Sequence, residues 1–182
     1  MRIDPKYFNT FLLIVAIVAA SLIAYFIISN RSAEKSDFKQ RMFAQDSLQT
    51  TWWNNVQSGD SVQVSDFKGA YIVLDLWSNW SDASLKSHTE LAKIKQQYPD
   101  NLQVLAAAVG LQKKEVKEYI QKHQFPFHFV AGSRQFSEFN MPGLPVQFVY
   151  DQQLDLKHVF LGYSDDDQYD SLRVLINGGK QQ

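Results

Sequence analysis

The chain has 182 residues, with 18 lysines and arginines against 19 aspartates and glutamates, so its net charge near −1 gives no electrostatic basis for binding nucleic acid. It contains no cysteine, which excludes disulfides, thiolate nucleophiles and iron–sulfur clusters. The four histidines are scattered and lack the spacing of a zinc site. An apolar content of 45% is typical of a globular protein, and we expect no metal and no cofactor.

The N-terminal segment is long and apolar enough to cross a bilayer. Residues 8–28 carry no charge, and a helix of this length would extend for roughly 32 Å. We therefore predict an uncleaved transmembrane anchor over residues 1–30. The alternative is a cleaved signal peptide, but the apolar run continues through Ile28, well beyond the candidate cleavage site at Ala19-Ala20-Ser21.

Basic residues flank the apolar segment on both sides, so the positive-inside rule does not set its orientation. Residues 31–55 are polar and are interpreted as a juxtamembrane linker that becomes helical near Phe38–Leu48. Trp52-Trp53, within this stretch, either cap a sheet edge or contact the membrane surface, and we favour the cap. Residues 56–182 are predicted to form the globular domain.

Strand-like and helix-like segments alternate through most of this domain. This order predicts parallel crossovers and an α/β fold with a central sheet flanked by helices. The nearly continuous apolar run at 71–77 predicts a central strand that is covered on both faces. The later segments predict an antiparallel hairpin and a closing helix, so the sheet should be mixed. The expected elements are strands at 61–64, 71–77, 102–109, 127–130, 146–150 and 157–162, and helices at 81–98, 113–123 and 169–176.

Three short motifs follow one another along the chain. The first, 64–69, has the sequence VSDFKG before the expected central strand; the second, 74–80, ends that strand with LDLWSNW; the third, 139–148, reads FNMPGLPVQF. Together they resemble thioredoxin-like proteins, and in particular the membrane-anchored TlpA/ResA family of thiol-disulfide oxidoreductases (redoxins). The resemblance implies a thioredoxin-like fold over about residues 61–176, with Pro145 in a cis peptide bond.

Both redox cysteines of that family correspond to serines here, at Ser81 and Ser84. A serine hydroxyl has neither a thiolate near neutral pH nor a disulfide state. We therefore expect no catalytic residue at this degenerate motif and interpret the protein as a pseudo-enzyme. Ser81 is also a good N-cap for the following helix, and Asp82 places negative charge at the positive end of the helix dipole. An anion-binding role for this helix terminus is the alternative.

Two further residues near the motif bear on its chemistry. Ser84 and His88 are one helical turn apart with Asp75 nearby, which leaves open a Ser/His hydrolase as an alternative function. In the resemblance, Asp75 corresponds to the buried acid of thioredoxins. In thioredoxins that acid assists proton transfer from the second cysteine, which this chain lacks. We therefore expect Asp75 to make a structural hydrogen bond.

The resemblance also implies a peptide-binding surface, because in such proteins the loop before the cis-proline pairs with an extended segment of a partner. We predict that Trp80, Ser81, Asp82, Leu144 and Pro145 bind an unidentified protein partner. The expected role is that of an adaptor, a chaperone or a subunit of a membrane complex, in a single-pass protein of a bacterial inner membrane with its domain in the periplasm. A non-redox helper of a thiol-disulfide or cytochrome maturation pathway is the alternative.

Overall fold

The structure is a computed structural model that describes residues 5–164 and 167–178. The chain divides into two compact units, residues 1–38 and 39–182, which are described separately.

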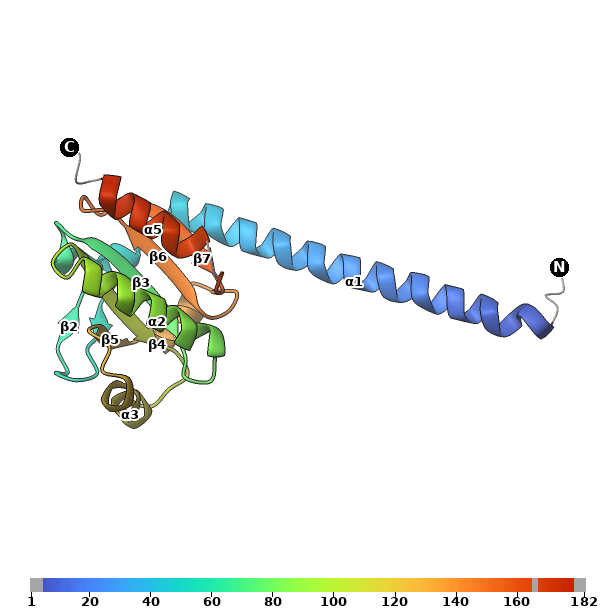
Figure 1. Cartoon of the computed structure of the whole chain (residues 1–182), viewed down its shortest axis with the longest axis horizontal. Coiled ribbons are helices and arrows are strands. Elements are labelled where there is room, and N and C mark those ends of the chain that lie inside the picture. Colours follow the sequence, from blue (N-terminus) through green and yellow to red (C-terminus); the bar gives the residue numbers. More distant parts are fainter. Residues whose placement is uncertain (1–4, 165–166, 179–182) are drawn as a thin grey trace. The chain divides into compact units, whose positions relative to one another are not determined.

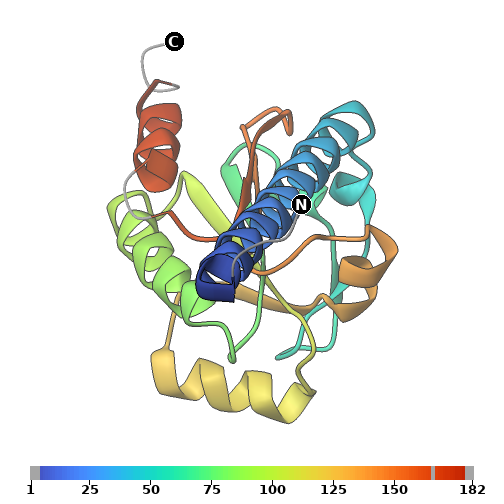
Figure 2. The ribbon, with the colours of Figure 1, turned by 90° about the vertical axis from the view of Figure 1, so that its right-hand side faces the viewer.

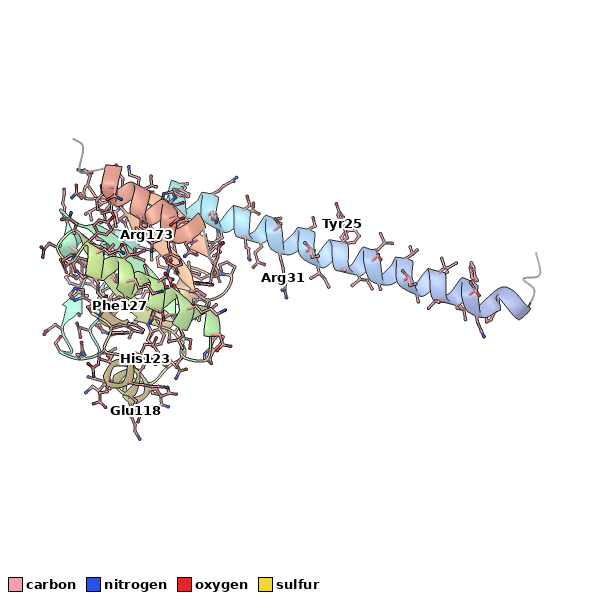
Figure 3. All side chains as sticks on the ribbon, viewed as in Figure 1. Tyr25, Arg31, Glu118, His123, Phe127 and Arg173 are labelled. Atoms are coloured by element: carbon pink, nitrogen blue, oxygen red, sulfur yellow. The ribbon has the colours of Figure 1, made fainter. Side chains whose placement is uncertain are left out.

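A single helix, α1 (Pro5–Ala44), makes up nearly all that is described of the first unit and extends into the second. The helix is long and apolar enough to span a membrane, and Figure 3 shows Tyr25 and Arg31 projecting outward from it. The predicted helix near Phe38–Leu48 is present as far as Ala44, but residues 31–37, which we expected to be a non-helical linker, are helical too and continue α1 without a break. This stretch contains neither glycine nor proline and offers the backbone no reason to leave the helix.

The second unit is built on a five-stranded mixed sheet in the order β5-β4-β3-β6-β7 (Figure 1). The central strand β3 runs parallel to β4 and antiparallel to β6. A separate two-stranded sheet pairs the short strands β1 and β2. The strands are β1 (Trp53–Asn54), β2 (Ser61–Val62), β3 (Tyr71–Trp77), β4 (Leu102–Ala108), β5 (His128–Ala131), β6 (Val146–Tyr150) and β7 (Leu156–Leu161).

Helices cover one face of the sheet around a continuous apolar core. Alternate side chains of β3, Val73 and Trp77, pack in one cluster with residues of α2, α3 and α5. Figures 1 and 2 show α2 and α5 side by side on this face. These helices are α2 (Asp82–Gln97), α3 (Lys113–His123) and α5 (Asp167–Gly178).

The opposite face receives the other side chains of β3, which are Ile72, Leu74 and Leu76 and are completely buried. Shorter elements lie on this side (Figure 2), and the Tyr150 hydroxyl of β6 donates a hydrogen bond to Asp46 there. The elements are two 3₁₀ helices, η1 (Leu48–Thr50) and η2 (Val64–Phe67), and the short helix α4 (Ser133–Glu138).

The predicted fold class, α/β with a mixed sheet flanked by helices, is confirmed. One strand was overextended: residues 61–64 form β2 only over Ser61–Val62, because Gln63 then caps η2, its backbone N–H donating to Asp66 at 2.7 Å. Trp53 is fully buried within β1, which contacts the edge strand β5, whereas Trp52 is exposed, so the sheet-edge cap that we favoured applies to Trp53 alone.

Candidate functional site

The candidate site lies where β3 ends and α2 begins. The Ser81 hydroxyl accepts a hydrogen bond from the backbone N–H of Ser84 at 3.3 Å, so Ser81 is the N-cap of α2, as predicted. Asp82 is exposed in the first turn, where its negative charge interacts favourably with the positive end of the helix dipole. The two serines are therefore placed by ordinary helix capping.

Ser84 differs from Ser81 in its surroundings. It is completely buried, and its hydroxyl accepts a hydrogen bond from the backbone N–H of Ser78 at 3.4 Å. This contact ties the first turn of α2 to the end of β3. Ser84 therefore closes the loop 78–81 and is not presented to solvent as a nucleophile.

Pro145 precedes β6 and follows a cis peptide bond from Leu144, as the resemblance implied. Val146, the first residue of β6, pairs with Leu76 near the end of β3. The chain therefore enters the sheet directly after Pro145. The Pro145 carbonyl still accepts from the N–H of Gly162 at 2.8 Å. Within residues 5–164 and 167–178, neither the N–H nor the C=O of Leu144 makes a hydrogen bond. Leu144 thus offers one free donor and one free acceptor at the edge of the site.

The two tryptophans of the second motif have opposite roles. Trp80 is 70% exposed and lies over the turn after β4, where a Cβ built on Gly110 would be 3.9 Å from its indole nitrogen. Trp77 is completely buried, with its ring 4.3 Å from that of Tyr119 and 4.7 Å from that of His88, centroid to centroid. Only Trp80 is available to a binding partner.

Asp75 is completely buried, but among the described residues neither of its carboxylate oxygens makes a hydrogen bond, so the structural hydrogen bond that we expected is not formed. Its carboxylate oxygen Oδ2 lies 3.0 Å from Nε2 of His88, which is also completely buried. Nδ1 of His88 in turn lies 2.8 Å from the hydroxyl of Tyr119 on α3. The three side chains form a chain that joins β3, α2 and α3 behind the site.

This arrangement does not support the alternative of a Ser/His hydrolase. Both ring nitrogens of His88 face Asp75 and Tyr119, and no hydrogen bond joins Ser84 to His88 within the described part of the chain. A nucleophilic serine needs a base within hydrogen-bonding reach of its hydroxyl. The pair is one helical turn apart in sequence, but each member has a different partner.

A buried polar network with no counterpart among the predicted site residues includes β6, which begins directly after Pro145. Gln147 of β6 donates to the Ser87 hydroxyl of α2, which also accepts from the Tyr169 hydroxyl at 2.8 Å. Gln168 of α5 donates to the carbonyl oxygen of the Gln147 side chain. The network fixes α2 and α5 against β6. In the sequence, this network is indicated only by Gln147, an amide within the otherwise apolar run 146–150.

Burial dominates the electrostatics behind the site. It raises the pKa of the Tyr119 phenol, and the negative charge of Asp75 raises it further. Burial likewise lowers the pKa of His123, with smaller contributions from Lys122 and His88. Within the described residues, no group of three or more His, Cys, Asp or Glu side chains could hold a metal ion.

Known proteins share this architecture. A thiol:disulfide interchange protein DsbE from Chlorobium tepidum superposes with a TM-score of 0.62 at 17% identity, over 70% of this chain and 91% of its own. A secreted disulfide oxidoreductase from Mycobacterium tuberculosis, homologous to E. coli DsbE, gives 0.61 at 14% identity, over 74% and 99%. StoA from Bacillus subtilis gives 0.54 at 15% identity, over 68% and 92%.

The domain has a thioredoxin-like fold. A sequence comparison agrees: thioredoxin-like protein YneN from Bacillus subtilis is 19% identical over 109 residues, which are 58% of this chain and 64% of YneN. The chain therefore spans less than two thirds of that relative. No protein-family model matches the chain. The thioredoxin-like domain carries Ser81 and Ser84 at the redox motif and has no cysteine elsewhere in the sequence.

Proposed function

We propose that the protein is a redox-inactive, membrane-anchored thioredoxin-like protein that binds a partner protein as an adaptor, a chaperone or a subunit of a membrane complex. The partner would bind at the relic surface, which we define as Trp80, Ser81, Asp82, Leu144 and Pro145. The observation that carries this proposal is the exposure of Trp80 together with the unpaired backbone groups of Leu144.

The lack of redox chemistry follows from the residue types. Thiol–disulfide exchange requires a thiolate that attacks a disulfide sulfur. The hydroxyls of Ser81 and Ser84 cannot take this role, and no other residue of the chain carries a thiol. We therefore propose that the domain is not a thiol-disulfide oxidoreductase.

Binding remains possible because it needs no sulfur. An extended peptide that runs beside Leu144 could accept from its N–H and donate to its C=O, which is the pairing used when a strand is added to a sheet edge. A side chain of that peptide could then pack on the exposed indole of Trp80. Tryptophan is enriched among the residues that dominate binding energy at protein interfaces.

We further propose that α1 holds the domain on the periplasmic side of a bacterial inner membrane. The length and apolar character of α1 support an anchor. The secreted Mycobacterium tuberculosis oxidoreductase with the same fold supports a location outside the cytoplasm. Protease digestion of intact spheroplasts tests the orientation: the domain should be degraded from outside, and its survival until the membrane is disrupted would contradict it.

A second role is favoured by the similarity to proteins named as thiol:disulfide interchange proteins. In this version, the domain is a non-redox helper of a thiol-disulfide or cytochrome maturation pathway. It would hold a cysteine-bearing client without reacting with it. The two roles differ in the partner, since the helper requires a partner with a pair of cysteines in the bound segment.

Site-specific photocrosslinking tests the proposed binding. A photoreactive phenylalanine derivative is placed at position 80 in the full chain, expressed in its native membrane, and in a matched control at position 52. Trp52 is also an exposed tryptophan, at 61%, but lies outside the relic surface. We expect a discrete crosslinked protein only from position 80. Equal crosslinking from both positions, or none from position 80, would contradict the proposal.

A further inference from the structure

A cavity of about 330 Å³ lies at the carboxyl ends of the parallel strands β4 and β5. Its walls come from the last residues of these strands, from the start of α3, and from the end of β1 with the loop that follows it. In open α/β sheets, ligands bind in the crevice outside the carboxyl ends of the strands. The cavity shares no residue with the relic surface, so it is a separate candidate site.

Small side chains at the ends of the two strands leave this space open. Ala108 ends β4 and Ala131 ends β5, and the two residues are paired in register, so their methyl groups lie on the same face of the sheet. Val116 of α3 lies opposite them across the cavity. Val56, Ala108 and Val116 are all buried, and they give the cavity an apolar floor.

The loop after β1 forms another wall and is held by hydrogen bonds of its own. The side-chain oxygen of Asn55 accepts from the backbone N–H groups of Gln57 and Ser58, at 2.8 and 3.1 Å. The N–H of Val56 donates to the carbonyl oxygen of Phe129 on β5 at 2.9 Å. The wall is therefore fixed both within the loop and against the sheet, and it needs no ligand to keep its shape.

The polar side chains that line the cavity present mainly hydrogen-bond donors. The amide oxygen of Asn55 already accepts twice, and that of Asn54 accepts from the Ser61 hydroxyl at 3.1 Å, so the NH₂ groups of both amides remain available. Lys113, the first residue of α3, also lines the cavity, and within the described part of the chain its ammonium group has no ion-pair or hydrogen-bond partner. Of the described residues that line the cavity, only Lys113 is charged.

We propose that this cavity binds a small monocarboxylate with a short apolar chain. The carboxylate accepts from the Lys113 ammonium and from the NH₂ group of Asn55, and the chain lies on the floor of Val56, Ala108 and Val116. The single positive charge matches one carboxylate and disfavours an amine. The apolar floor favours this ligand over phosphate or sulfate, which have no apolar part. At the roughly 30 Å³ that one water occupies in the liquid, the cavity has room for about ten non-hydrogen atoms.

Titration of the full chain with butyrate, in micelles of an uncharged detergent near neutral pH, tests the site. It involves no partner protein, so its outcome is independent of the proposed function. Binding is followed by NMR through the methyl signals of Ala108, Val116 and Ala131, and we expect a dissociation constant on the order of 1 mM for so small a ligand. Acetate, with a shorter chain, should bind about tenfold more weakly. Absence of shifts with butyrate, or equal shifts with butylammonium, would overturn the proposal.

Variants of neighbouring lysines separate the site from non-specific binding. Lys113→Met removes the charge and should weaken butyrate binding about three- to tenfold. Lys114→Met is the matched control, because the Lys114 side chain is exposed and lies near Glu118 instead of lining the cavity, and it should leave the affinity unchanged. Ala131→Phe fills the cavity from an exposed position and should abolish binding. If Ala131→Phe does not fold, the lysine variants still decide, since equal butyrate affinities of Lys113→Met and Lys114→Met would overturn the proposal.

Discussion

The hydroxyl of Ser81 and the backbone N–H of Ser84 are hydrogen-bonded at 3.3 Å, across the two positions that correspond to redox cysteines. Ser81 thus caps α2, and Ser84 supplies the backbone N–H that the cap binds. This relationship leads to the first two predictions.

Restoring sulfur should restore a disulfide. In the double variant Ser81→Cys/Ser84→Cys, the two side chains begin within one turn at the N-terminus of α2, a separation that a disulfide can bridge. We expect an intramolecular disulfide after mild oxidation, measured by thiol titration and mass spectrometry. Each single cysteine variant is the control and should keep one free thiol. Two free thiols in the oxidised double variant would mean that the loop 78–81 holds them apart.

Removing the cap should weaken the helix. Ser81→Ala loses the acceptor for the Ser84 N–H and should lower the free energy of unfolding by about 1 kcal/mol. Urea unfolding of the full chain in detergent measures it. Thr89→Ala, an exposed position of α2 whose hydroxyl bonds back to Leu85, is the control and should change stability by less than about 0.5 kcal/mol. Equal effects of both variants would argue against the capping role.

A glycine next to the sheet permits a close backbone approach. A Cβ built on Gly132 would lie 2.8 Å from the Cβ of Ala107 and 3.1 Å from its carbonyl oxygen. Gly132→Ala should therefore lower the free energy of unfolding by roughly 1–3 kcal/mol. Gly143→Ala is the control, because no atom lies within 4 Å of its Cβ position. Unfolding curves that coincide for the two variants would contradict this account of the contact between β4 and the start of α4.

The β6–β7 turn should make stability sensitive to acid. Burial tends to raise the pKa of Asp151, but hydrogen bonds from Lys157 and from the N–H groups of Asp155 and Gln153 outweigh it and lower the pKa. A carboxyl whose pKa is lowered on folding contributes stability above its unfolded value, near 3.8, and loses it as pH falls through the folded value.

We therefore expect the urea midpoint of the wild type to decrease as pH falls below about 4, and Asp151→Asn to show a smaller decrease. Asp155→Asn is the comparison, since Asp155 is exposed and also contacts Lys157. If the urea midpoint fell equally with pH in the wild type and in Asp151→Asn, the turn would not contribute to the acid sensitivity of stability.

The sequence predicted the sheet better than the site. The nearly continuous apolar run 71–77 is typical of a strand buried on both faces, and the structure buries all of its residues. The turn beginning at Asp151 was also predictable, because Asp side chains bond to the backbone two residues on, as here with Gln153. Helix α4 was missed because its six residues are too few to show a helical period.

The partner of His88 could not be predicted from spacing. Ser84 and His88 share a helical face, but the rotation of α2 on the sheet brings His88 to Asp75 and leaves Ser84 at the loop. Tyr119 reaches His88 from 31 residues away, across a parallel crossover. Such contacts depend on how helices dock, which local sequence patterns do not encode.

The most direct test of partner binding compares two tryptophan variants. Full-length wild type, Trp80→Ala and Trp52→Ala are purified from crosslinked membranes, and the recovered partner is quantified by mass spectrometry. Both tryptophans are exposed, so neither variant should unfold the domain. The account predicts that Trp80→Ala reduces recovery by about tenfold or more, the loss expected for an interface anchor, while Trp52→Ala retains it. Undiminished recovery with Trp80→Ala would contradict binding at the relic surface.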